Sequence, residues 1–514
     1  MQRNHNARNY VLSLYKMSIP ENASKLSPDE IYDRLKGCIF GAALGDAVGL
    51  ATEFLSKSKA RELYGIGPIS FGSDKGYEFH RDYHRRRWDD GDWTDDTDQQ
   101  LLIIDSLIAT NGLFNSRDFA HRLSKWVNKG YPELNNKPPF GIGKTVGTVL
   151  SHSKFEAKPH RASWEVWVRF NRNMAANGAL MRTAVLGAPF FWDEKQVIKQ
   201  TLQATKVTHA DPRCCVSSLI VTNLISRLLK DNTQDILPDL DDETKKEILK
   251  WTQSGNPDNQ SDLDIDSEDP PSVIKSRHVK KKSIIGKIIN KVSSKGNNSE
   301  TNYIIRRNSD KLKQNNPREV VKIPENPPPG IDTFGADPVM SAFVRSVVER
   351  YKFITNSVSV EQQPEKSLTN FQVDIGEEAL LKYCFPDNLA SLELDEGSSI
   401  GYVYKCLGSA LYCFTRNLNQ QPSEGEAFKT IITELTLEAG DSDTNGAVAG
   451  ALLGARIGYE KLPKSWVDGL KFKSWLEDRV NSLWTVVSGK EDWVEVDDSY
   501  KSIDVSQVYI NLST

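Results

Sequence analysis

Apolar residues recur at helical spacing along most of the chain. Intervals of three and four residues separate them in 101–108, 119–127 and 196–229, and the same spacing returns over 337–350 and 401–414. This period is typical of amphipathic helices. The strict alternation expected of half-buried strands is scarce. The pattern therefore predicts an all-α protein.

Two of the predicted helices carry a glycine at every fourth position. One starts at Ser27-Pro-Asp-Glu30, which has the form of a capping box with proline in the first turn. The glycines are Gly37, Gly41, Gly45 and Gly49 in this helix, and Gly446, Gly450, Gly454 and Gly458 in the other. Each glycine costs a helix about 0.8–1 kcal/mol relative to alanine, so a smooth ridge needs a reason, such as close approach of another backbone. We expect both helices to be buried and closely packed within one core, and two unrelated crowded helices remain the alternative.

The distribution of charge divides the chain into segments. Residues 231–273 are rich in acids, and residues 275–323 carry fourteen Lys or Arg against three acids. Blocks of single-sign charge with few aromatic residues are typical of disordered insertions. The expected organisation is a flexible leader (1–26), a first helical part (27–230), a disordered charged insertion (231–335), a second helical part (336–488) and a tail (489–514). The basic block is a solvated linker or a patch for nuclear import or an anionic surface, and any contact with nucleic acid is expected only there.

Composition narrows the class of protein. The chain has 514 residues, a formal charge of −4 and 38 % hydrophobic residues, with a mean hydropathy of −0.49. Its six cysteines form neither a CxxC pair nor a disulfide framework, which favours a reducing, intracellular setting. The polar N-terminus and the absence of eighteen consecutive apolar residues predict neither secretion nor a membrane span. We expect a cytoplasmic or nuclear protein, and a monomer.

Two acidic stretches more than three hundred residues apart carry the candidate chemistry. The first, Trp88–Asp98, holds six aspartates, and no Lys or Arg occurs from Trp88 to Thr110. The second, Ala439–Gly446, places Asp441 and Asp443 at alternate positions beside a threonine. Such dense negative charge repels itself unless a cation lies among it. Oxygen ligands without Cys or His suit Mg²⁺, Mn²⁺ or Ca²⁺ better than zinc. The hypothesis is that the two stretches meet and hold hard divalent metal.

Each stretch alone has an alternative explanation. Asp and Thr at a helix start cap free N–H groups and suit the positive end of the helix dipole. The run Arg85–Arg87 just upstream could pair with some of the acids at the surface. Gly141–Thr145 is either a backbone nest for phosphate or a plain turn. A lone histidine such as His209 is either structural or functional. Two stretches of one kind, each opening a helix, favour the metal interpretation.

Taken together, these motifs resemble the ADP-ribosylglycohydrolase family, also called ADP-ribosyl-acceptor hydrolases. The resemblance spans roughly 31–230 and 335–460, and excludes the insertion and both tails. The matching segments are Gly41–Gly49 with Glu53, Trp93–Asp98, Asn177–Arg182, Thr208-His209 and Ala439–Gly446. The resemblance implies a compact orthogonal helical bundle with a cleft that holds two Mg²⁺ or Mn²⁺ ions.

The resemblance also implies roles for particular residues. The implied metal ligands are Thr94, Asp95, Asp96, Asp441, Asp443 and Thr444. The implied catalytic residues are Glu53, Asp96 and Asp443, and the implied substrate contacts are Glu53, Gly141, Gly143, Asn177, Gly178 and His209. Arginine-specific bacterial members have an Asp where this chain has Gly141, so the Gly-x-Gly form is closer to members that act on serine-linked or O-linked ADP-ribose.

The expected function is metal-dependent hydrolysis at the anomeric carbon of ADP-ribose, which would release ADP-ribose from a modified protein or a small acceptor. Two alternatives remain. One is a non-catalytic ADP-ribose reader with the same fold and metals. The other is a purely structural helical protein whose aspartates are caps. The motifs do not identify the linkage, the acceptor or the choice between Mg²⁺ and Mn²⁺.

Overall fold

The structure is a computed structural model that describes residues 17–134, 137–234, 238–256, 334–357 and 376–489. The first sixteen residues, most of the predicted insertion (257–333) and the tail from 490 lie outside the described residues.

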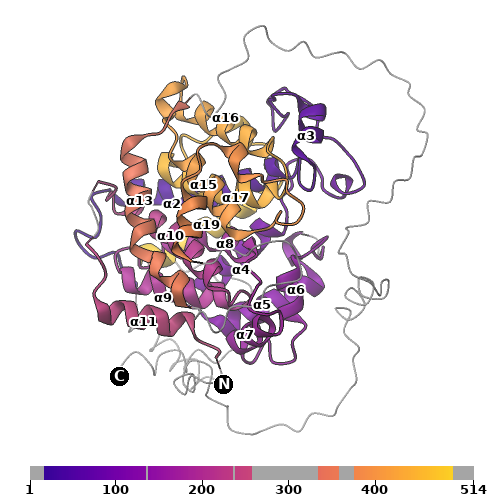
Figure 1. The fold of residues 1–514 in the computed structure, drawn as a ribbon. Helices are drawn as coiled ribbons and strands as arrows, with labels where there is room; N and C mark the ends of the chain where they lie inside the picture. Colours follow the sequence, from indigo (N-terminus) through magenta and orange to yellow (C-terminus); the bar gives the residue numbers. More distant parts are fainter. Residues whose placement is uncertain (1–16, 135–136, 235–237, 257–333, 358–375, 490–514) are drawn as a thin grey trace, which may run out of the picture. The chain divides into compact units, whose positions relative to one another are not determined.

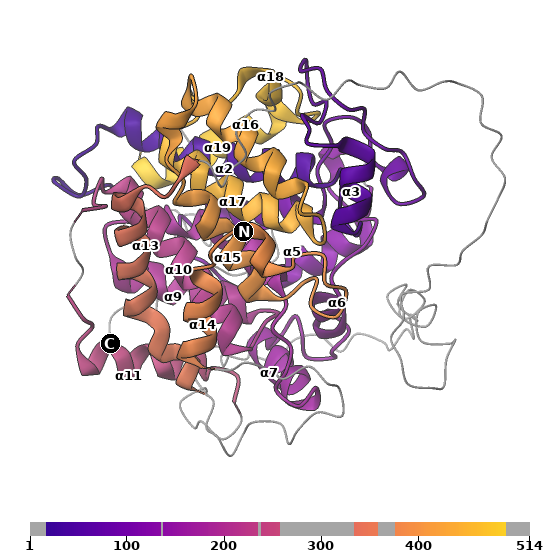
Figure 2. The same ribbon diagram turned by 45° about the horizontal axis from the view of Figure 1, so that its top comes forward.

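The described residues form helices and no strand, with only isolated bridges such as the one between Ala176 and Tyr402 (Figures 1 and 2). This confirms the all-α prediction. The helices of the first part are α2 (Pro28–Gly49), α3 (Lys57–Tyr64), α4 (Asp95–Ala109), α5 (Ser116–Lys129), α6 (Lys144–Leu150), α7 (Pro159–Arg169), α8 (Leu180–Thr183), α9 (Glu194–Lys206), α10 (Pro212–Leu229) and α11 (Asp242–Thr252). Those of the second part are α13 (Pro338–Tyr351), α14 (Glu377–Cys384), α15 (Val403–Phe414), α16 (Glu424–Thr436), α17 (Ser442–Ile457), α18 (Lys464–Val467) and α19 (Lys473–Ser488).

The glycine ridges of α2 and α17 face one another, and the two helices run antiparallel. A Cβ added to Gly41 would overlap the carbonyl oxygen of Gly450, and one added to Gly450 would overlap that of Gly41. The same reciprocal overlap joins Gly45 with Gly446. Only glycine lets two backbones approach this closely, because any side chain would enter the facing carbonyl groups. The expected burial of both ridges is confirmed, and the reason for it is their direct contact.

Other helices pack against the α2–α17 pair, and its antiparallel arrangement determines which helix ends are neighbours. Helices α15, α16 and α10 pack against α17, and α16, α19 and α10 pack against α2 (Figure 1). Since the helices are antiparallel, the C-terminal end of α2 lies beside the N-terminal start of α17. The turn after Gly49 and the acidic stretch before Gly446 are therefore neighbours in space. A Cβ on Gly49 would overlap the carbonyl oxygen of Ser442.

The helical spacing over 196–229 corresponds to two helices, α9 and α10, and the second starts where Asp211 caps a turn that opens with Pro212. Two expectations about segments need correction. The insertion was expected to be disordered from residue 231, yet α11 forms there and its end is held by Lys206, whose ammonium donates to the carbonyl oxygen of Trp251 at 3.2 Å. Residues 17–26 of the expected leader are also ordered, with the Ser24 hydroxyl donating to Leu229 at 2.6 Å.

Two further properties bear on the class of protein. All six cysteines are free and buried. Within the described ranges, the helices are too short or too polar to cross a bilayer.

Candidate metal and substrate site

The turn that follows α2 carries Glu53 and is fixed by backbone contacts. The amide of Phe54 donates to the carbonyl oxygen of Gly440 at 2.7 Å, and the amide of Gly440 donates to Leu55 at 3.1 Å. Buried Arg85 donates from Nε to the carbonyl oxygen of Ala51 at 2.8 Å, and its guanidinium also bonds the carbonyl of Glu53. These bonds place Glu53 beside the segment that leads into α17.

The start of α4 is held by a carboxylate of α2. Asp46 is fully buried and accepts hydrogen bonds from the Thr94 amide at 3.1 Å, the Thr97 amide at 3.0 Å and the Thr97 hydroxyl at 2.6 Å. These donors are free N–H groups of a helix N-terminus, which favours negative charge. Burial still raises the pKa of Asp46 to about 7, although the hydrogen bonds from Thr97 and Thr94 oppose the rise. Asp46 therefore fixes the acidic stretch of α4 against the C-terminal end of α2.

The aspartates of the first stretch separate into two groups. Asp98 accepts the indole N–H groups of Trp93 at 2.9 Å and Trp126 at 3.0 Å, so it is a structural acceptor. Asp96 is buried, and its Oδ2 has no hydrogen-bond partner among the described residues. Asp95 accepts from the side-chain amide of Gln99 at 2.8 Å. An unpaired buried carboxylate oxygen is costly, so Asp96 marks a place where a positive ligand fits.

Capping accounts for part of each stretch. Thr94 is the N-cap of α4, and its hydroxyl accepts from the Asp96 amide at 3.4 Å. At the start of α17, Asp441 occupies the N-cap position but makes no capping bond with its side chain. Its Oδ2 instead accepts from the side-chain amide of Asn177 at 2.7 Å. The capping alternative therefore explains Thr94 and leaves the aspartates of the second stretch unexplained.

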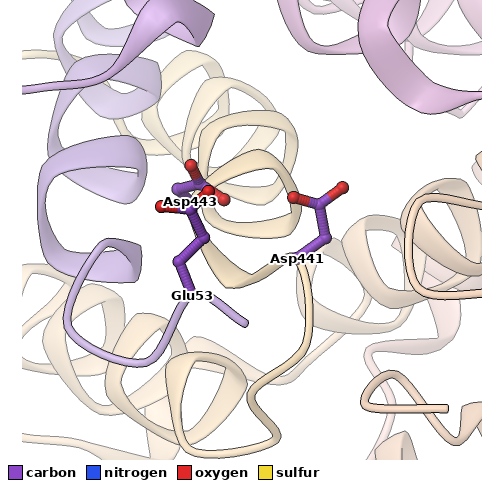
Figure 3. A group of neighbouring side chains, drawn as sticks. All are labelled: Glu53, Asp441 and Asp443. Carbon is purple, nitrogen blue, oxygen red and sulfur yellow. The ribbon is translucent and has the colours of Figure 1, made fainter. Parts of the chain in front are cut away.

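Carboxylates of the turn after α2 and of the second acidic stretch come together at the end of the α2–α17 pair. One oxygen each from Glu53, Asp441 and Asp443 lies within 4.8 Å of the others (Figure 3). Figure 3 shows Glu53 reaching in from the turn after α2, while Asp441 and Asp443 come from the start of α17. Such an acidic group could hold a metal ion.

The electrostatics of the group show its need for positive charge. Burial raises the pKa of Asp443 well above its usual range, and Glu53 and Asp96 raise it further. Burial likewise raises the pKa of Asp96, with Asp46 and Asp95 adding to the rise. Asp441 has its pKa raised to about 6 by burial, and the hydrogen bond from Asn177 opposes this shift. Without a cation these groups therefore hold protons more tightly than free aspartates do.

The loop that presents Asn177 is tied to the start of α15. The Asn177 amide donates to the carbonyl oxygen of Gly401 at 3.0 Å, and the Val403 amide donates to Ala175 at 3.0 Å. Next in sequence, Gly178 packs on the ring of His209, because a Cβ at Gly178 would lie 3.3 Å from its Cε1. Asn177, Gly178 and His209 therefore form one wall next to Asp441.

His209 is a buried, neutral histidine. Burial lowers its pKa well below the usual value, and the charge of Arg182 lowers it further. The guanidinium of Arg182 donates to the Thr208 hydroxyl at 2.6 Å, and this hydroxyl lies 2.8 Å from Nδ1 of His209. The other ring nitrogen, Nε2, has no hydrogen-bond partner among the described residues.

Gly141 and Gly143 lie on an exposed loop before α6. A Cβ built at either position would meet no atom within 4 Å, so neither glycine is required by packing. The loop connects to the acidic group through aromatic rings: Phe140 contacts Trp88 at 4.8 Å between ring centroids, and Trp88 contacts His84 at 5.0 Å. These ring contacts link the loop to His84, and neither glycine lies among the carboxylates.

Sequence reasoning missed Asp46, His84 and the Gln99–Arg182 contact. Asp46 had a signal, since an acid on an otherwise apolar, glycine-rich helix needs buried partners. The Arg182 guanidinium donates to Gln99 Oε1 at 2.7 Å and so supports the amide that holds Asp95. His84 gave no sequence signal, because its partner Glu53 is thirty-one residues away. The suggested pairing of Arg85–Arg87 with the acidic stretch is also corrected: Arg85 pairs with Asp82.

Comparison with known proteins gives a consistent set of relatives. Residues 27–289 and 336–492 match the model of a family described as ADP-ribosylglycohydrolase. ADP-ribosylarginine hydrolase Tri1 from Pseudomonas putida is 27 % identical over 168 residues, which are 32 % of this chain and 38 % of that protein. The Tri1 protein of Serratia proteamaculans is 25 % identical over 208 residues, 40 % of this chain and 50 % of that protein. Human ADP-ribosylhydrolase ARH3 is 36 % identical over 68 residues, 12 % of this chain and 18 % of that protein. The chain thus spans half or less of the length of each of these relatives.

Proposed function

The chain belongs to the ADP-ribosylglycohydrolase family, and from this premise we propose that it is a metal-dependent hydrolase that cleaves the bond at the anomeric carbon of ADP-ribose. The substrate is an ADP-ribosylated protein side chain or a small ADP-ribosyl acceptor. The observation that carries the proposal is the meeting of Glu53, Asp441 and Asp443, whose oxygens lie within 4.8 Å of one another next to Asp96.

The donor set fits a pair of hard divalent cations. The proposed ligands are Thr94, Asp95, Asp96, Asp441, Asp443 and Thr444, which offer oxygen atoms only. Mg²⁺ and Mn²⁺ favour such ligands. The unpartnered Oδ2 of Asp96 and the mutual repulsion of the carboxylates support this assignment. When bound, two Mg²⁺ or Mn²⁺ ions would orient ribose hydroxyls and acidify a water molecule.

The residues of the chain have separate tasks in the proposed reaction. Cleavage at the anomeric carbon develops oxocarbenium character on the ribose, and ionised Asp96 and Asp443 stabilise that positive charge. Glu53 reaches the cluster from a different segment of the chain, so we assign it the positioning of water and the acceptance of its proton. Asn177 holds Asp441 in place through its 2.7 Å hydrogen bond.

The wall beside Asp441 and the exposed glycine loop are the proposed contacts for the rest of ADP-ribose. Neutral His209 offers its Nε2, which has no partner among the described residues, next to Gly178. Gly141 and Gly143 leave open space over their backbone, where N–H groups can approach phosphate. Both features can supply hydrogen-bond donors without adding negative charge, which suits an anionic pyrophosphate.

Two observations favour different linkages. Two relatives are named as ADP-ribosylarginine hydrolases, which supports an arginine-linked substrate. Gly141 stands where the resemblance places an Asp in arginine-specific members, which supports serine-linked or O-linked ADP-ribose. The deciding experiment is incubation with arginine-, serine- and O-acetyl-linked ADP-ribose, with and without a chelator. Chelator-sensitive release of ADP-ribose from one of the three identifies the linkage and the need for metal together.

Substitution of the carboxylates tests the proposed roles. We expect Asp96→Asn and Asp443→Asn each to lower turnover at least a hundredfold, because each removes a proposed metal ligand. A hundredfold loss corresponds to about 2.7 kcal/mol of transition-state stabilisation. Circular dichroism should show an unchanged helical fold. Asp89→Asn is the matched control from the same stretch, since exposed Asp89 pairs with Lys471 at 2.6 Å, and it should keep wild-type turnover. Retained turnover in the purified Asp96→Asn/Asp443→Asn protein would refute the assignments, and binding of ADP-ribose by the wild type without product would favour a reader.

A further inference from the structure

The carboxylate of Glu53 is hydrogen-bonded to a histidine that lies outside the sequence motifs described above. Oε2 of Glu53 lies 2.6 Å from Nε2 of His84, and the two side chains are mostly buried. The other ring nitrogen of His84, Nδ1, contacts a guanidinium nitrogen of Arg87. The three residues form a row that starts at the acidic group and ends at Arg87, beside the rings of Trp88 and Phe140.

The donors and acceptors in this row settle the direction of each bond. A guanidinium has N–H groups and no acceptor, so Arg87 donates and Nδ1 of His84 accepts. A neutral imidazole with an acceptor at Nδ1 carries its hydrogen on Nε2. His84 therefore donates to the carboxylate of Glu53, as a histidine oriented by a second partner does.

The ring of His84 is fixed independently of Glu53. It packs against Phe54 at 5.2 Å and Trp88 at 5.0 Å between ring centroids. The backbone amide of His84 donates to Asp82 at 3.0 Å, and Nε of Arg87 donates to the carbonyl oxygen of His84 at 2.9 Å. A ring that packs against two aromatic side chains, in a residue whose amide and carbonyl are both hydrogen-bonded, presents its N–H in one direction.

We propose that His84 is a positioning residue that holds the Glu53 carboxylate toward Asp441 and Asp443, with Arg87 keeping the required hydrogen on Nε2. This inference rests on the proposed function only for its catalytic consequence. Like charges repel Glu53 from the cluster, because it faces two aspartates within 4.8 Å. A donated hydrogen bond at Oε2 offsets that repulsion, and the carboxylate keeps lone pairs for a cation. Removing such an outer partner typically lowers metal affinity or activity 10–100-fold.

Two substitutions at one position separate the donated hydrogen bond from the bulk of the ring. His84→Gln places an amide N–H at about the distance of Nε2 from Cα, so it can still donate to Glu53. His84→Asn is one carbon shorter and ends near the position of Nδ1, so it loses the contact. The control is His152→Asn, which removes a comparable histidine contact, 3.0 Å from Glu165, outside the site.

The measurement is Mn²⁺ binding to the chelator-treated full chain by isothermal titration calorimetry, followed by kcat and KM. We expect His84→Asn to weaken Mn²⁺ binding about 10–100-fold and to lower kcat more than it raises KM, while His84→Gln and His152→Asn keep wild-type affinity. Matching thermal unfolding midpoints of the metal-free variants establish that the fold is intact. Wild-type affinity in His84→Asn, or equal losses in the Asn and Gln variants, would overturn the inference.

The same experiment keeps the two proposals apart. A wild type that binds Mn²⁺ but releases no ADP-ribose refutes the proposed function, and the calorimetric order of the variants still decides the role of His84. If the wild type binds no Mn²⁺, the role of His84 toward a metal site is overturned as well. Turnover without any effect of His84→Asn supports the function and rejects the inference.

Discussion

Several of the described helices have an aspartate at the N-cap position, and two of these aspartates, in α10 and α17, have opposite electrostatic environments. Asp211 opens α10, and Asp441 opens α17. Asp211 caps its helix through the Arg213 amide at 3.0 Å, pairs with the Arg213 guanidinium at 2.8 Å and accepts the Trp167 indole N–H at 3.0 Å. Burial would raise the pKa of Asp211, but the charge and hydrogen bonds of Arg213 lower it below the usual value.

At the start of α17, Asp441 has no ion pair with a cationic side chain among the residues that the structure describes. Asp441 makes no capping bond, receives one amide hydrogen bond from Asn177, and has its pKa raised to about 6 by burial. Glu53 adds to the rise. The difference shows that a helix-start aspartate is structural when its neighbours supply positive charge and hydrogen bonds. Where they supply more negative charge, the fold itself leaves room for a cation.

The largest expected effect follows from removing the ion pair of Asp211, the aspartate whose charge is compensated by its neighbours. Asp211→Asn removes the partner of Arg213, which is buried with 3 % of its surface exposed. Loss of one partner from a buried ion pair costs about 3–5 kcal/mol, since the remaining charge is left uncompensated. We expect the free energy of unfolding from urea denaturation to fall by this amount.

The corresponding test at the start of α17 is a substitution of Asp443, in the first turn of that helix, and it should have a different effect on stability. Asp443→Asn removes a charge whose pKa is raised by burial and by Glu53 and Asp96. In chelator-treated protein it should leave the free energy of unfolding unchanged or raise it, because repulsion among the carboxylates is relieved. An equal loss of stability in Asp211→Asn and Asp443→Asn would show that the two starts do not differ as described.

The contrast between Asp211 and Asp441 also shows which features of the structure can be predicted from the sequence. The helical period and the capping signals predicted most helices, since these signals act between residues three or four apart. The two glycine ridges predicted buried, tightly packed helices, although only the structure shows that Gly41 and Gly450 face one another. Asp211 and Asp441 already differ locally, because Arg213 lies two residues after Asp211 and Asp443 two residues after Asp441. The fold adds Trp167 beside Asp211, and Glu53 and Asn177 beside Asp441.

Contacts between distant segments were the part that local rules could not supply. The His84–Glu53 contact joins residues thirty-one positions apart, and the Asn177–Asp441 contact joins residues 264 positions apart. Neither pair has a spacing that matches a helix face or a turn. Resemblance to a family supplied candidates such as Glu53 and Asn177, whereas His84 became visible only once the chain was folded.

A smaller effect is expected when a divalent cation is added to the proposed metal site, because binding should stabilise the folded protein. A ligand that binds only the folded state stabilises it by about 2.7 kcal/mol when its concentration is a hundred times the dissociation constant. We expect Mn²⁺ or Mg²⁺ to raise the thermal unfolding midpoint of chelator-treated wild type in a concentration-dependent way. Asp211→Asn should keep this increment, although its starting midpoint is lower, and Asp443→Asn should lose it. A metal-induced shift that survives in Asp443→Asn would place the bound ion elsewhere.

The smallest expected effect is the pH dependence contributed by Asp441. Its pKa is raised from 3.8 to about 6 on folding, so the folded chain holds this proton more tightly than the unfolded chain. The associated stability is fully present below pH 3.8 and is lost as the pH rises through about 6. Relative to Asp441→Asn, metal-free wild type should lose about 1–2 kcal/mol between pH 4 and 7, a figure reduced for the partial exposure of the group.

Urea unfolding of both metal-free proteins across that pH range measures the difference directly, because contributions from other groups cancel. Saturating Mn²⁺ should reverse the trend in the wild type, since a cation competes with the proton for the same oxygens and binds more tightly as the pH rises. Asp211 should act in the opposite sense in the absence of metal, because its lowered pKa contributes stability that is lost on acidification. Parallel pH profiles for wild type and Asp441→Asn would mean that Asp441 is as well satisfied by its neighbours as Asp211 is.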